Sequence, residues 1–179
     1  MNLLINFSIF HLGWLACVVG AANNLAAEGS IAAVALIAVH LYRAELRRNE
    51  LVLIVVAVLT GLIWESALLS LGWFSYAGQS PLSYLAPFWL LMIWALFATT
   101  INGSLAWMKG RLVLSMFMGA VFGPVAFVAG EKLGAIVFTD RPIGLLALAL
   151  GWAVLMPLLI WIADRINRDP ENEEALSDA

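Results

Sequence analysis

The chain has 179 residues, of which 63% are hydrophobic and 12% are charged, and its formal net charge is -3. An average soluble domain is about 45 to 50% apolar and about 25% charged, so a water-soluble fold of this size could not cover so much apolar surface. The composition predicts one all-α membrane domain, and no Lys/Arg run indicates a nucleic-acid partner.

Six apolar runs, broken by charged residues and by Gly, Pro and Asn clusters, predict a bundle of six transmembrane helices. A spanning helix needs about 20 apolar residues, so six spans with short loops use nearly the whole chain. We therefore expect a transmembrane domain over residues 1–168 and an acidic disordered tail over 169–179. The predicted spans are residues 3–22, 30–42, 51–71, 88–107, 112–129 and 143–162.

The distribution of basic residues predicts the orientation of the bundle. Seven Lys and Arg residues follow spans two, four and six, whereas Lys132 and Arg141 fall on the opposite face. Because positive charges are retained on the cytoplasmic side, both termini are expected in the cytoplasm. The segment 131–142, on the external side, is expected to be an interfacial or re-entrant turn. A cleaved signal peptide is an alternative for the first span, but no basic residue precedes its apolar run, which favours a retained helix.

Glu65 is the most informative polar residue, because it lies within the third predicted span. An ionisable side chain at the centre of a span costs about 2.5 to 3.5 kcal/mol unless it is paired or hydrated. Glu65 could act as a general acid or base, as a proton carrier or as a ligand for a cationic group. Alternatively, it could only hold two helices together. We expect it at the edge of an aromatic cavity in the outer half of the membrane, lined by Trp64, Trp89, Trp94, Asn23 and Glu131.

A second polar layer is predicted nearer the inner surface. His11, in the first span, and three polar residues of the fourth span reach a comparable depth at about 1.5 Å per residue. His11 could shuttle protons, although a histidine that bonds to a neighbouring helix explains it slightly better. The three residues of the fourth span are Thr99, Thr100 and Asn102.

The remaining motifs concern packing more than chemistry. Gly119 and Gly123 are four residues apart, a spacing that lets helices approach closely, so they predict a packing face. Cys17 is the single cysteine, which excludes an intrachain disulfide. The two histidines and Glu65 lack the spacing of a metal site, and no nucleophile elbow or phosphate-binding loop is present, so we expect neither metal nor cofactor.

A set of aromatic, polar and small residues recurs along nearly all of the chain except the acidic tail: Asn6, Phe7, Trp14, Trp64, Glu65, Gly72, Tyr76, Pro87, Trp89, Leu90, Trp94, Phe97, Thr100, Ser104, Trp107, Gly123, Pro124, Ala129, Gly130, Leu133 and Gly134. These residues resemble the pattern of an uncharacterised bacterial inner-membrane family, domain of unknown function 2878. His11 stands where the family pattern has glutamine. The family is often encountered near genes for fatty-acid or phospholipid modification, so the resemblance implies a lipid-linked role in the bacterial inner membrane.

Three hypotheses for function follow from the sequence. The first is a lipid-pathway enzyme or a lipid-binding accessory protein that uses Glu65 as its acid, base or anchoring carboxyl, with membrane lipids as its partners. The second is a small proton-coupled transporter or channel, in which Glu65 and the second polar layer mark successive steps across the bilayer. The third is a non-catalytic scaffold for a lipid-modifying enzyme.

Overall fold

The computed structural model describes residues 3–78, 82 and 84–168, and its fold is all-α apart from one small sheet. The predicted tail over 169–179 lies outside the described residues. The elements are, in order, α1 (Leu3–Ala22), α2 (Ala26–Arg43), α3 (Arg47–Ser70), β1 (Phe74–Tyr76), α4 (Phe88–Ile101), the short 3₁₀ helix η1 (Ala106–Met108), α5 (Leu112–Lys132), β2 (Ile136–Phe138) and α6 (Arg141–Asn167).

Five of the six α-helices are long and apolar enough to cross a membrane, which fits a multi-pass membrane protein. The exception is α4, with fourteen residues. Its length of about 21 Å is less than the roughly 30 Å of a bilayer's hydrocarbon core. The fourth predicted span, residues 88–107, is thus a shorter helix followed by turns and η1.

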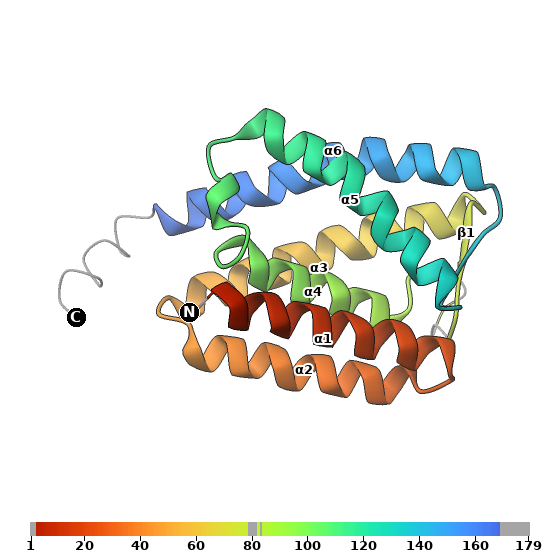
Figure 1. The fold of residues 1–179 in the computed structure, drawn as a ribbon, viewed down its shortest axis with the longest axis horizontal. Coiled ribbons are helices and arrows are strands. Elements are labelled where there is room, and N and C mark those ends of the chain that lie inside the picture. Colours follow the sequence, from red (N-terminus) through yellow and green to blue (C-terminus); the bar gives the residue numbers. More distant parts are fainter. Residues whose placement is uncertain (1–2, 79–81, 83, 169–179) are drawn as a thin grey trace.

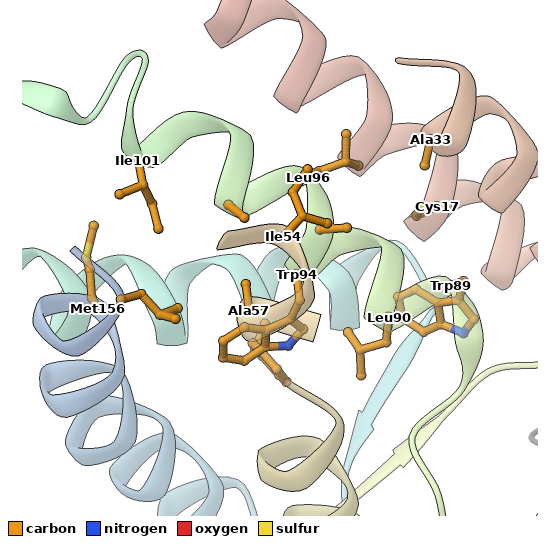
Figure 2. Close-up of a cluster of buried hydrophobic side chains, with 14 of the residues drawn as sticks. Cys17, Ala33, Ile54, Ala57, Trp89, Leu90, Trp94, Leu96, Ile101 and Met156 are labelled. Atoms are coloured by element: carbon orange, nitrogen blue, oxygen red, sulfur yellow. The ribbon is translucent and has the colours of Figure 1, made fainter. Parts of the chain in front are cut away.

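α4 can be short because it is the central helix of the bundle. Nine of its fourteen residues are buried. Figure 2 shows its side chains between Cys17 and Ala33 of the α1–α2 hairpin on one side and Met156 of α6 on the other. Non-helical backbone at membrane depth is tolerated where protein surrounds it. At the end of α4, the buried Asn6 of α1 supplies hydrogen bonds to the backbone. Its side chain donates to the Thr99 carbonyl and accepts from the Ser104 amide.

The two ends of the bundle differ in structure (Figure 1). At one end, here called the terminus end, lie the start of α1 and the end of α6. At the other, here called the sheet end, β1 and β2 form an antiparallel pair that joins the α3–α4 connection to the α5–α6 connection. The segment 131–142 is therefore the end of α5, strand β2 and the start of α6, where Asp140 caps the helix by accepting from the Ile143 amide.

The small residues of α5 allow it to pack closely on α6, as predicted. A side chain at Gly119 would meet the backbone carbonyl of Trp152, and one at Gly123 would meet the Trp152 ring. Gly29 has the same role in the α1–α2 hairpin, where a side chain would meet the Ala16 carbonyl. Close approach of this kind matters in lipid, because helix association there depends on packing rather than on removing apolar surface from water.

We predict that Gly119→Leu destabilises the bundle by about 1–3 kcal/mol, because its side chain would overlap a backbone carbonyl that cannot move alone. The measurement is thermal or denaturant unfolding of the purified protein in mild detergent. Val121→Ile is the control, since Val121 lies on the same helix and is exposed. Equal stability of the two variants would contradict this account of the α5–α6 contact.

Candidate functional site

Glu65 is fully buried on α3, and both of its carboxyl oxygens accept hydrogen bonds from aromatic side chains. Tyr76 of β1 donates its hydroxyl to Oε2 at 2.8 Å. Trp94 of α4 donates its indole Nε1 to Oε1 at 3.1 Å. A buried carboxyl is costly without such partners, so these two bonds explain how the bundle accommodates it. The carboxyl links α3, α4 and the sheet end.

Gly61 makes the bond between Trp94 and Glu65 possible. It lies four residues before Glu65, so both face the same side of α3. A side chain at Gly61 would overlap the indole of Trp94, which shows that the ring lies against the bare backbone there. On its other side the ring stacks on Trp152 of α6, with centroids 4.9 Å apart and planes 17° apart. Trp94 is therefore held between α3 and α6 with its N–H directed at Glu65.

The sheet positions Tyr76 over Glu65. Tyr76 pairs with Ile136 in the β1–β2 ladder, and the next amide, of Ala77, donates to the Ala135 carbonyl at 2.8 Å. The Ala77 carbonyl in turn accepts from the indole of Trp89 at 2.8 Å. Burial, and then the neighbouring Glu65, raises the pKa of Tyr76 far above its usual range. Its hydroxyl consequently stays protonated and remains a donor.

Beside this carboxyl lies a groove with a volume of about 530 Å³, and Glu65 is part of its lining. The groove is almost wholly apolar and is open on one side. Its mouth is between α1 and α5, because the lining residues Phe7, Phe122 and Val125 of these helices are more than half exposed. The buried rings of Trp89 and Trp94 on α4 form its floor. In Figure 1, α4 lies between α1 and α5.

Only some of the residues predicted to line a cavity do so. Trp89 and Trp94 line the groove, whereas Trp64, Asn23 and Glu131 are not part of its lining. Trp64 packs instead over Gly151 of α6. Asn23 is exposed in the turn after α1 and donates to the Val19 carbonyl in the last turn of that helix, so it contributes nothing to the cavity. Glu131 forms an ion pair of 2.6 Å with Arg141 that joins the end of α5 to the start of α6.

The residues predicted as a second polar layer are dispersed over separate environments. Thr99 and Thr100 donate their hydroxyls to carbonyls three residues earlier in α4, although Thr100 also lines the groove. His11 lines the groove as well, and its Nδ1 lies 2.9 Å from the Phe7 carbonyl of its own helix. Local backbone groups satisfy these side chains, so no joint layer is needed to explain them.

Asn102 belongs to a different polar network, at the terminus end, which the sequence analysis did not identify. Its Nδ2 donates to Glu50 at 3.0 Å, and its Oδ1 accepts from Lys109 at 2.7 Å and from Asn167 at 2.9 Å. The second Glu50 oxygen lies 3.1 Å from Nε2 of His40. Burial lowers the pKa of Lys109, an effect that nearby carboxylates oppose. The network joins α2, α3, α6 and the turn after α4, so we interpret it as a set of contacts that holds these elements together.

The chemical capacity of the site is that of one carboxyl at an apolar surface. In the described part of the chain, no three His, Cys, Asp or Glu residues come together in a way that could hold a metal ion. Among the residues that the structure describes, His11 is the one lining side chain able to carry a positive charge. Tyr76 was not predicted as a hydrogen-bond partner of Glu65. Gly61 was a signal for the approach of Trp94, because it shares a helix face with Glu65 and leaves space for a large ring there.

Comparison with known proteins identifies a family. A family model described as "Protein of unknown function (DUF2878)" matches residues 3–158. Comparison with curated proteins and with solved structures gives no match. The match covers all six α-helices except the last part of α6, and it confirms the resemblance that the aromatic and polar positions predicted. The chain therefore belongs to the DUF2878 family of proteins of unknown function.

Proposed function

We propose that this protein binds a lipid chain in the groove between α1 and α5, as an integral protein of the bacterial inner membrane. The observation that carries the proposal is an apolar groove, open on one side, within a bundle of membrane-type helices. Its rims are the exposed apolar faces of α1 and α5. In a bilayer such faces contact lipid, so a chain could enter sideways without crossing water.

The dimensions of the groove suit a single chain. Its lining on α1 extends from Phe7 to Val18, which is about 16 Å along the helix axis. One leaflet supplies about half of a hydrocarbon core of roughly 30 Å, so the groove is about as long as one leaflet is deep. Its volume lies within the range of about 300–1,000 Å³ that is usual for small-molecule sites.

Glu65 serves in this proposal as the polar end of the binding site. It is held by Tyr76 and Trp94 at the sheet end, where the chain would meet the interface. The aromatic rings around Glu65 exclude water from its carboxyl, and the same rings provide the surface on which the chain packs.

We predict that Ala126→Phe reduces the amount of lipid that copurifies with the protein in mild detergent by several-fold. Ala126 lies on the groove side of α5 and is only partly exposed, so the added ring would occupy the groove. The measurement is native mass spectrometry combined with lipid extraction. Ala35→Phe is the matched control, because Ala35 is exposed on α2 and does not line the groove. Equal lipid content in the two variants would contradict the proposal.

The proposed arrangement in the membrane has six spans with both termini in the cytoplasm. It rests on the distribution of basic residues and on the start of α1 and the end of α6 lying at one end of the bundle. Because α4 lies inside the bundle, its helix together with the turns after it would serve as the fourth span.

This topology predicts how a membrane-impermeant maleimide labels two variants, each with one cysteine added to the native Cys17. Thr139→Cys, in the exposed connection at the sheet end, should be labelled in intact cells with a permeable outer membrane. Glu45→Cys, in the exposed turn between α2 and α3, should be labelled only after the inner membrane is opened. The native Cys17 is buried and provides the unlabelled background. The reverse pattern would invert the topology.

A further inference from the structure

We infer that the ligand of the groove is a neutral single-chain lipid that carries a hydroxyl group, and that this hydroxyl binds to Glu65. The inference rests on the proposed function and adds the chemical class of the ligand. It follows from the polar groups that the groove presents, and from those that it lacks.

The charges of the groove argue against an anionic head group within it. Glu65 and His11 are the ionisable side chains among the described lining residues, and His11 is on α1. The basic side chain of Arg141, at the sheet end, is not part of the lining and is paired with Glu131. A carboxylate or phosphate beside Glu65 would therefore lose its hydration and face another acidic group, and His11 is the one described lining side chain that could balance its charge.

The hydrogen bonding of Glu65 favours a hydroxyl. An ionised carboxylate offers about four acceptor positions, and Tyr76 and Trp94 use one on each oxygen. The remaining positions can accept from a ligand that has a donor. If the carboxyl is instead protonated, its own O–H needs an acceptor. A hydroxyl both donates and accepts, so it suits either form, whereas an ammonium suits only the ionised form and an ether only the protonated one.

A second unsatisfied group next to the same rings also favours a ligand oxygen. The indole Nε1 of Trp152 is buried and has no hydrogen-bond partner. Trp152 lines the groove and stacks on the ring that donates to Glu65. An ammonium cannot accept a bond from this N–H, but a hydroxyl oxygen can. Glu65 has no exposed surface, so a ligand group can reach it only if the surrounding rings shift slightly.

The experiment compares four probes with one chain length on the purified full-length protein in nanodiscs. The probes are hexadecan-1-ol, its methyl ether, hexadecylamine and hexadecane, each competing with radiolabelled hexadecan-1-ol. Hexadecan-1-ol should bind at least about tenfold more tightly than the ether, which corresponds to about 1.4 kcal/mol for the hydrogen bond that the ether cannot donate to the carboxyl. This comparison needs no variant and so does not depend on a substitution that could unfold the protein.

Variants then assign the preference to Glu65. Glu65→Leu should bring the affinity for the alcohol down to that of the ether and leave the affinity for the ether unchanged. Glu28→Gln, on the exposed face of α2, should leave both unchanged. Equal affinity of the wild-type protein for alcohol and ether, or tighter binding of the amine, would overturn this inference while chain binding stands. If no probe binds in a manner sensitive to Ala126→Phe, the proposed function itself fails.

Discussion

The structure depends on one constraint, which is that a carboxyl enclosed by membrane helices must obtain its hydrogen bonds from protein rather than from water. Glu65 meets this constraint with one phenol and one indole, and each donor brings its own structural requirement. The phenol of Tyr76 needs the β1–β2 pairing to hold it over the end of α3. The indole of Trp94 needs the space that Gly61 provides. One costly side chain thereby accounts for the sheet and for the position of the central helix.

Tryptophan and glycine occur as complementary partners across three of the helix contacts. Trp94 lies over Gly61, Trp64 over Gly151, and Trp152 over Gly123. In each case a side chain on the glycine would overlap the ring, so the pair gives a large contact area at a short distance between helix axes. Such pairs supply the packing that replaces the hydrophobic effect inside a bilayer. They also place the rings of Trp94 and Trp152 side by side, and both of these rings line the groove.

Long apolar runs made most of the fold predictable. The predicted bounds of the first span coincide with α1, and the others overlap their helices, because hydropathy over some twenty residues is a strong signal. The helix within the fourth predicted span, residues 88–107, ends earlier than expected, since the sequence cannot indicate that a helix is enclosed by its neighbours. The sheet was not predicted at all. Each strand has three residues, and β1 pairs with a strand some sixty residues later, which no local pattern encodes.

The site was predictable to the extent that burial cost identifies a residue. The free-energy cost of placing a carboxyl within a span identified Glu65, and the rise per residue of a helix placed Trp94 at a similar depth. Depth does not give direction around a helix, however, and for this reason Trp64 and Asn23 were predicted at a cavity that neither faces. The same limit applies to the second polar layer. Thr99 and Thr100 share a depth with His11, but short hydroxyl side chains in a helix bond most readily to their own backbone.

Two carboxyls are buried in the described part of the chain, and they differ in a way that bears on function. Glu50 lies in a network that contains a lysine, a histidine and amides. Glu65 has only neutral donors and adjoins a groove. A carboxyl kept solely to hold helices together is expected to resemble Glu50, with its charge balanced within the fold. The unbalanced carboxyl is the one placed where a ligand could complete its bonding, and this contrast makes Glu65 rather than Glu50 the centre of the proposed site.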